Sequence, residues 1–79
     1  MADFILAIDQ GTTSCRSIIF NKTGAIVSSA QKEISQIFPH PGWVEHDPEE
    51  ILASQVSVVH ESLLKARLSY KDILTIGIT

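Results

Sequence analysis

The stretch that decides the fold covers residues 4–20 and reads FILAIDQGTTSCRSIIF. An unbroken apolar run occupies residues 4–8, and a second apolar run occupies residues 17–20. Short apolar runs with polar boundaries are typical of strands that are covered on both faces of a sheet. The stretch therefore predicts two neighbouring strands joined by a polar loop from Asp9 to Arg16.

A second turn follows directly after these strands. Residues 21–24 read NKTG, and the glycine can adopt the positive φ that a tight turn needs. We expect a hairpin there, leading into a third strand over residues 25–34. Residues 35–46 read SQIFPHPGWVEH, and their two prolines and glycine predict an ordered loop. The first three strands are thus expected to run antiparallel in succession.

A helix is predicted after this loop. The Asp47 side chain can accept hydrogen bonds from the free backbone amides at the start of a helix. Pro48 suits the first turn, and Glu50 has the spacing from Asp47 that a capping box needs. An apolar face follows at helical spacing, formed by Leu52, Val56, Val59, Leu63 and Ala66. Residues 73–78, ILTIGI, are then expected to form a fourth strand that enters the sheet after a helical crossover.

The order strand, strand, strand, helix, strand predicts an α/β fold with a mixed sheet. The chain has 79 residues. A domain this short buries only about 60% of the surface that its unfolded chain exposes. We therefore expect an incomplete domain of a longer parent protein.

Composition excludes several classes of function. Six Lys and Arg stand against nine Asp and Glu, with a formal net charge of −3, so the basic stripe needed for nucleic-acid binding is missing. No apolar run approaches membrane-spanning length, and the N-terminus lacks the pattern of a signal sequence. The single cysteine, Cys15, cannot form an internal disulfide, which favours a cytoplasmic location.

The loop between the first two strands has the chemistry of a phosphate site. It contains a glycine, three hydroxyl side chains and an arginine, namely Gly11, Thr12, Thr13, Ser14 and Arg16. Amides and hydroxyls donate to phosphate oxygens, and the arginine adds a fixed positive charge. A carboxylate repels phosphate, so Asp9 indicates Mg²⁺ between the two. The loop therefore predicts a site for a metal-bound nucleotide.

Spacing excludes two other phosphate motifs. The loop has no Gly-Lys-Ser/Thr ending, and one glycine does not make a dinucleotide fingerprint. From residue chemistry alone an alternative stays open, in which the polar side chains satisfy only the hydrogen bonds of the turn itself.

Two segments resemble a known family. DQGTTSCR, residues 9–16, resembles the first phosphate motif of the actin, hexokinase and heat-shock chaperone superfamily, and Gln10 and Arg16 match its form in the glycerol kinase branch of the carbohydrate kinases. PGWVEHDPEEI, residues 41–51, is similar to a second hallmark of that branch. The resemblance implies a ribonuclease H-like fold, with residues 1–79 as the N-terminal part of the first of two domains.

The same resemblance implies ATP-dependent phosphorylation of glycerol to sn-glycerol 3-phosphate by the parent, with ATP and Mg²⁺ required. Thr12 would contact the terminal phosphate of ATP and the product phosphate, and Asp9 would sit beside the metal. Further nucleotide contacts would come from Gly11, Thr13, Ser14 and Arg16. The general base of the family lies beyond Thr79, so we expect no catalytic residue here and no activity from this segment alone.

Two residues depart from the family pattern. Cys15 stands where serine or alanine is more usual and is expected to place a thiol near the nucleotide, whereas Leu52 replaces a frequent tryptophan. Two other functions stay open, a kinase for another polyol or sugar and a non-catalytic ATPase switch of the actin or chaperone type. We expect glycerol and ATP as partners of the parent, no nucleic acid or membrane, a homo-oligomeric parent, and self-association of the segment through its sheet.

Overall fold

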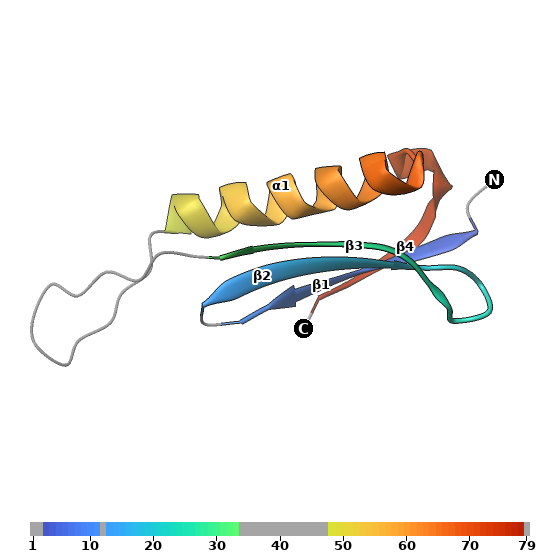
Figure 1. Cartoon of the computed structure of the whole chain (residues 1–79), viewed down its shortest axis with the longest axis horizontal. Helices are drawn as coiled ribbons and strands as arrows, with labels where there is room; N and C mark the ends of the chain where they lie inside the picture. The colour runs from blue at the N-terminus through green and yellow to red at the C-terminus, as the bar shows by residue number, and fades with distance from the viewer. Residues whose placement is uncertain (1–2, 12, 34–47, 79) are drawn as a thin grey trace, which may run out of the picture.

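The described residues form two layers, a four-stranded sheet and one long helix that runs along one face of it (Figure 1). The computed structural model describes residues 3–11, 13–33 and 48–78. In chain order the elements are β1 (Phe4–Gln10), β2 (Ser14–Phe20), β3 (Ile26–Glu33), α1 (Pro48–Ala66), the short 3-10 helix η1 (Tyr70–Asp72) and β4 (Ile73–Ile78). The expected loop at residues 35–46 and the expected cap at Asp47 lie outside the described residues.

The sheet has the mixed topology that the sequence predicts. Its strand order is β3-β2-β1-β4. β2 pairs antiparallel with both β1 and β3, whereas β4 pairs parallel with β1. A parallel neighbour cannot be reached by a hairpin, and α1 supplies the crossover. The α/β fold class and the order of its elements are confirmed.

Two strand boundaries differ from the prediction. β1 continues through Gln10, and β2 begins at Ser14, so both extend into the predicted loop. Asp9 lies opposite Arg16 in the ladder. Main-chain pairing does not require apolar side chains, and polar side chains are tolerated wherever the pleat points them to solvent. The predicted polar loop is therefore mostly strand, with a tight turn at its centre.

The turn between β2 and β3 has the predicted glycine conformation. Gly24 has a φ of +88°. The Asn21 side-chain oxygen accepts hydrogen bonds from the backbone amides of Thr23 and Ala25, each at 3.0 Å. β3 then begins at Ile26, one residue after the predicted start.

The ends of α1 follow from local chemistry. The helix begins at Pro48, as predicted, since a proline in the first turn needs no partner for an amide. Beyond its C-terminus, Arg67 has a left-handed φ of 57°. Its amide donates to Leu64 at 3.1 Å, and the amide of Leu68 donates to Leu63 at 2.9 Å. These bonds form a Schellman motif, which turns the chain back towards β4.

The core between α1 and the sheet combines aliphatic side chains with serines. The buried apolar residues are Leu6, Cys15, Ile19, Ala30, Val58, Val59 and Leu63. The hydroxyl oxygens of Ser17 and Ser62 lie 2.9 Å apart, and Ser28 donates to the Ser62 carbonyl at 2.8 Å. The Ser62 hydroxyl donates to the Val59 carbonyl at 2.9 Å, so the Ser17 hydroxyl is the donor in their pair. The hydroxyls of Ser17, Ser28 and Ser62 are thus satisfied between the helix and the sheet.

The predicted apolar face of α1 is only partly correct. Val59 and Leu63 are buried, but Leu52 and Val56 are 62% and 56% exposed. α1 lies over β2 and β3 (Figure 1). Its buried positions are Ser54, Val58, Val59, Ser62 and Leu63. Small serine side chains allow close packing there, and the helix is therefore rotated away from the face that hydrophobicity alone predicts.

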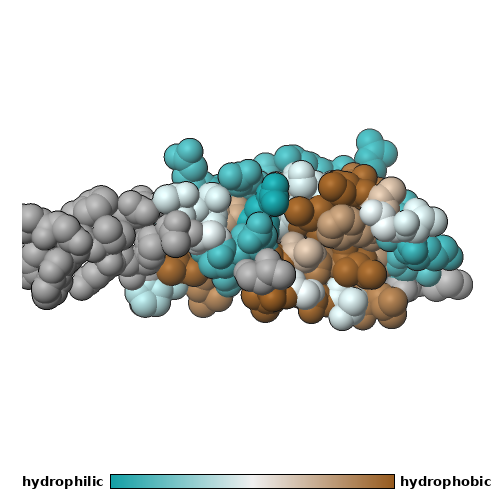
Figure 2. Space-filling view, turned by 90° about the horizontal axis from the view of Figure 1, so that it is seen from below, coloured by the Kyte–Doolittle hydropathy of each residue, from teal (hydrophilic) through white to brown (hydrophobic). Residues whose placement is uncertain are grey.

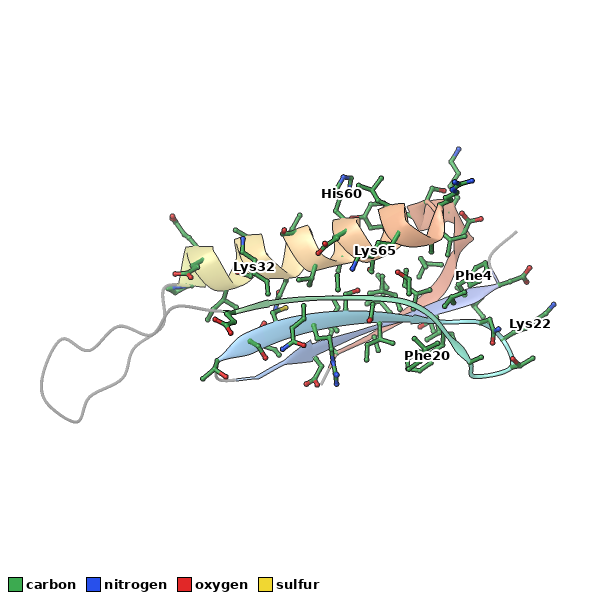
Figure 3. The ribbon with its side chains drawn as sticks, in the orientation of Figure 1. Phe4, Phe20, Lys22, Lys32, His60 and Lys65 are labelled. Atoms are coloured by element: carbon green, nitrogen blue, oxygen red, sulfur yellow. The ribbon has the colours of Figure 1, made fainter. Side chains whose placement is uncertain are left out.

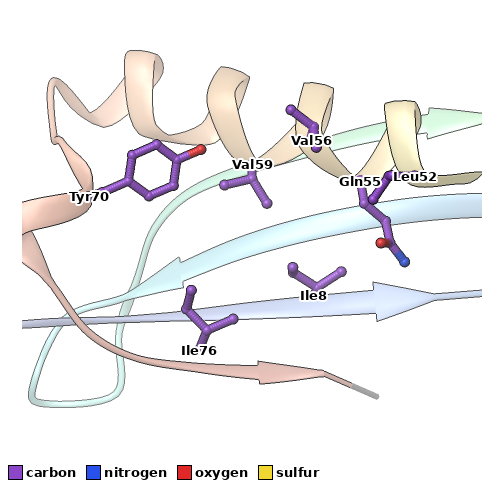
Figure 4. A pocket seen from close by; sticks show the side chains of 7 residues that line it. All are labelled: Ile8, Leu52, Gln55, Val56, Val59, Tyr70 and Ile76. Carbon is purple, nitrogen blue, oxygen red and sulfur yellow. The ribbon is translucent and has the colours of Figure 1, made fainter.

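An apolar groove remains between α1 and the strands β1 and β4 (Figure 4). It has a volume of about 210 Å³ and is lined by Ile8, Leu52, Gln55, Val56, Val59, Tyr70 and Ile76. On the other side of the sheet, Phe20 points away from α1 (Figure 3), and apolar side chains gather over this face (Figure 2). Among the described residues, no helix is both long and apolar enough to cross a membrane.

Candidate functional site

The turn that joins β1 to β2 is closed by a backbone hydrogen bond. The amide of Gly11 donates to the carbonyl of Ser14 at 2.9 Å. A Cβ atom on Gly11 would lie 3.3 Å from that carbonyl oxygen, so a side chain would crowd the two ends of the turn. Glycine is favoured here by the hairpin itself, and its contact with a ligand stays a prediction.

The pleat of the two strands divides the candidate residues between two faces. Successive side chains on a strand point to opposite sides of the sheet. Cys15 is buried against Val58 of α1, so its neighbour Arg16 points to the opposite, open face. Gln10 likewise points towards α1, and Asp9 points away from it. Two polar residues, Asp9 and Arg16, therefore share the open face beside the turn.

Asp9 and Arg16 form an exposed ion pair. Nη2 of Arg16 lies 3.4 Å from Oδ2 of Asp9, and the two side chains are 47% and 51% exposed, respectively. Water screens such a pair, which contributes at most about 1 kcal/mol to stability. Both side chains remain accessible from the solvent, so a charged ligand approaching this face can contact them.

Gln10 connects the turn to the helix. Nε2 of Gln55 in α1 donates to Oε1 of Gln10 at 3.0 Å, and Nε2 of Gln10 donates to the Gly11 carbonyl at 3.1 Å. Sequence reasoning assigned no role to Gln55. One signal pointed to it: at helical spacing it lies among Leu52, Val56 and Val59, where a polar side chain needs a partner.

The Cys15 side chain points away from the open face that carries Asp9 and Arg16, and its expected proximity to the nucleotide stays a prediction. Its side chain is fully buried beneath α1. Burial raises the pKa of the Cys15 thiol above 9.0, and the carboxylate of Asp9 raises it further. The thiol is therefore neutral at physiological pH and lacks the thiolate character of a reactive cysteine.

The remaining candidate residues lie close to the turn. Thr13 is exposed and Ser14 is half-buried at the start of β2, whereas Thr12 lies outside the described residues. No group of three or more His, Cys, Asp or Glu side chains forms a metal cluster among the described residues. A single carboxylate, Asp9, fits Mg²⁺, which commonly takes one or two protein carboxylates together with water and substrate phosphates.

Known proteins resemble this chain over nearly all of its residues. It is 66% identical over 76 residues to a glycerol kinase of Francisella philomiragia subsp. philomiragia, with 96% of this chain covered. It is 57% identical over 79 residues to glycerol kinase 1 of Clostridium tetani, with 100% covered. The chain spans only 15% and 16% of the length of these two relatives.

Solved structures share the fold of the segment. The crystal structure of Plasmodium falciparum glycerol kinase with ADP matches with a TM-score of 0.79 and 34% identity, over 96% of this chain and 15% of that one. The xylulose kinase of Rhodospirillum rubrum matches with a TM-score of 0.82 and 27% identity, over 95% and 15%. The predicted ribonuclease H-like fold is confirmed by this likeness. A family model for the N-terminal domain of the FGGY family of carbohydrate kinases matches residues 4–79, and the chain belongs to that family.

Proposed function

We propose that this chain is the N-terminal part of an ATP-dependent glycerol kinase. In this proposal residues 1–79 form the first part of one ribonuclease H-like domain in a two-domain enzyme. The full-length protein transfers the γ-phosphoryl group of ATP to a terminal hydroxyl of glycerol and releases sn-glycerol 3-phosphate. One observation carries the proposal: Asp9 and Arg16 share an exposed face beside a hydroxyl-rich turn, in a chain 66% identical to a glycerol kinase.

The proposed division of roles follows the chemistry of phosphoryl transfer. That reaction depends mainly on positioning the phosphates and neutralising their charge. Arg16 supplies positive charge to the nucleotide, while amides and hydroxyls of the turn donate to phosphate oxygens. The residues proposed for these contacts are Thr12, Thr13 and Ser14, with Thr12 also assigned to the product phosphate. Gly11, whose own amide donates to Ser14, is proposed to let the backbone approach the nucleotide closely.

Asp9 is proposed to hold Mg²⁺ through water. When bound, the ion screens the negative charge on the phosphate oxygens. The carboxylate of Asp9 offsets the charge of Arg16 in the free protein, and the two are separated by 3.4 Å without being buried. Arg16 can therefore turn to the nucleotide without leaving a buried charge unpaired.

The proposal places the general base, the glycerol contacts and the adenine pocket outside these residues, so the segment alone is inactive. A cytoplasmic location of the parent is proposed because the single cysteine of this segment, Cys15, cannot form an internal disulfide. The parent is proposed to be a homo-oligomer, with glycerol and ATP as its small-molecule partners.

A second candidate is a kinase for another polyol or sugar. The likeness to a xylulose kinase, with a TM-score of 0.82, favours this as the runner-up because the same segment is used with different acceptors. The described residues contain the candidate phosphate site, and phosphate contacts do not select the acceptor.

Assays of the full-length parent distinguish these functions. Phosphoryl transfer from ATP is measured separately with glycerol, xylulose, gluconate and no acceptor. We expect kcat/KM for glycerol to exceed the other values by at least about 100-fold, equivalent to about 2.7 kcal/mol of transition-state discrimination. A preference for a sugar would support the second candidate, and hydrolysis unaffected by any acceptor would support an ATPase switch.

A further inference from the structure

A chain of side-chain amides connects α1 to the candidate phosphate-binding turn. Gln55 is half-buried at the edge of the apolar groove, and its side chain extends from α1 towards the sheet (Figure 4). It donates to Gln10 at 3.0 Å, and Gln10 donates to the Gly11 carbonyl at 3.1 Å. The interaction bridges residues 45 positions apart in the sequence.

The direction of this amide chain is fixed by its last member. A backbone carbonyl only accepts hydrogen bonds, so Gln10 must present its NH₂ group to Gly11. Its oxygen then faces Gln55, which must in turn present its own NH₂ group. The order of donors therefore requires a donor, and not merely a polar atom, at position 55.

We propose that Gln55 is a positioning residue for the phosphate-binding turn and acts through Gln10. The bond from Gln10 orients the Gly11 carbonyl. That bond holds the backbone at the start of the turn in one orientation. A turn that is ordered before the nucleotide arrives lowers the ordering cost of binding. The inference rests on the proposed function for its kinetic consequence, but the link to the turn stands on geometry alone.

Neighbouring contacts distinguish this role from simple packing. The Gly11 amide already closes the turn through Ser14 at 2.9 Å, so the hairpin does not need Gln55 to form. The apolar core of α1 is supplied by Val58, Val59 and Leu63. Removing the amide of Gln55 is therefore expected to loosen the turn and leave the sheet and helix folded.

The test uses the full-length parent with two substitutions at one position. Gln55→Met keeps the length of the side chain and removes the donor, and Gln55→Glu keeps the shape and places an acceptor against Gln10. Ala53→Glu is the control, since Ala53 is exposed on the same helix and the substitution adds the same charge. Melting temperatures, hydrogen exchange of residues 9–14 without nucleotide, and KM values for ATP and glycerol are measured for each variant.

We expect exchange in the turn to accelerate by about 3- to 10-fold in both Gln55 variants, the range that loss of one hydrogen bond supports. We expect kcat/KM for ATP to fall by a similar factor, with KM for glycerol and the melting temperature nearly unchanged. Ala53→Glu should match the wild type. In a double-mutant cycle, the variant that combines Gln10→Met with Gln55→Met should show no faster exchange in the turn and no lower kcat/KM for ATP than the more damaging of the two single variants.

The outcomes separate this inference from the proposed function. If the wild type does not phosphorylate glycerol, the proposed function fails, while faster exchange in the Gln55 variants still supports the link to the turn. Wild-type exchange in both variants overturns the inference, as does equal loss of ATP and glycerol affinity. Failure of both variants to fold also overturns it, because Gln55 would then be a structural residue.

Discussion

At the scale of single residues, the pleat decides what each side chain beside the turn can do. Asp9 and Gln10 are neighbours in sequence, but one forms an exposed ion pair on the open face and the other bonds to α1. Arg16 and Cys15 divide in the same way, with the arginine exposed and the thiol buried. Residues suited to binding charge therefore lie on one face, and residues that anchor the turn lie on the other.

Substitution of Asp9 tests the metal assignment. Asp9→Asn keeps the volume but removes the charge, so phosphoryl transfer by the parent is expected to fall by at least about tenfold. Stability should change little, because the ion pair with Arg16 is exposed and 3.4 Å long. Steady-state kinetics at saturating Mg²⁺ and a thermal melt measure the two effects.

Glu61→Gln provides the matched control. Glu61 forms a similarly exposed ion pair with Lys65 at 3.9 Å, on α1. Removing its charge should leave turnover unchanged. Equal turnover of wild type and Asp9→Asn would eliminate Asp9 as the residue that holds the metal.

Cys15 should make stability depend on pH in the alkaline range. Burial raises its folded pKa above 9.0, so the unfolded chain loses this proton first as the pH rises. The free energy of unfolding therefore falls above pH 9. Denaturant titrations at fixed protein concentration, between pH 7 and pH 10, should show this fall in the wild type.

Cys15→Ala isolates the contribution of the thiol. The difference in free energy of unfolding between wild type and variant should be constant below pH 8 and should shrink above pH 9, since the variant has no proton to lose. A difference that stays constant to pH 10 would show that the thiol ionises equally in both states.

At the scale of elements, the helix face is set by close packing and not by hydrophobicity alone. Ser54 and Ser62 are buried, while Leu52 and Val56 are mostly exposed. The hydroxyl of Ser62 bonds within α1 and to Ser17, so its burial leaves no unsatisfied donor. The end of the helix is set by neighbouring residues. The left-handed φ of Arg67 allows the amide of Leu68 to donate to the carbonyl of Leu63.

Arg67→Gly is expected to stabilise the fold. A left-handed φ of 57° is unfavourable for a residue with a Cβ atom. Glycine removes this strain, but it also gives the unfolded chain more conformational entropy to lose on folding. The net gain in the free energy of unfolding is expected to be about 0.5–1 kcal/mol. Denaturant titration at fixed protein concentration measures the gain. Lys71→Gly, at an exposed position without positive φ, should give no stabilisation, and a loss in Arg67→Gly would contradict the strain argument.

At the scale of the whole molecule, one side of the sheet and the groove beside α1 are both apolar and exposed (Figures 2 and 4). β4 is an edge of the described sheet. Ile76 and Ile78 on this strand are 52% and 72% exposed. An apolar edge strand provides both unpaired backbone groups and surface for association.

The 79-residue chain alone is therefore expected to self-associate through β4, the groove or the open face of the sheet. Burial of about 600 Å² of apolar surface would contribute on the order of 15 kcal/mol before the entropic costs of association. Sedimentation at tens of micromolar should show a dimer or larger assembly. Ile76→Lys should weaken association through β4 and the groove, whereas Leu64→Lys, exposed but outside the groove, should not. A folded wild-type monomer with concentration-independent melting would contradict this expectation.

The sequence by itself determined the element order, the glycine turn at Gly24 and the start of α1 at Pro48, because each depends on residues that are neighbours in the chain. Its two family-like segments also indicated the kinase family. The extent of the strands into the phosphate motif, the rotation of α1 and the contact of Gln55 with Gln10 were decided only by the tertiary structure. The first depends on main-chain pairing between the two strands, which polar residues also support. The other two depend on how a helix packs against strands far away in sequence, where small serines and hydrogen bonds between elements outweigh the apolar periodicity of the helix.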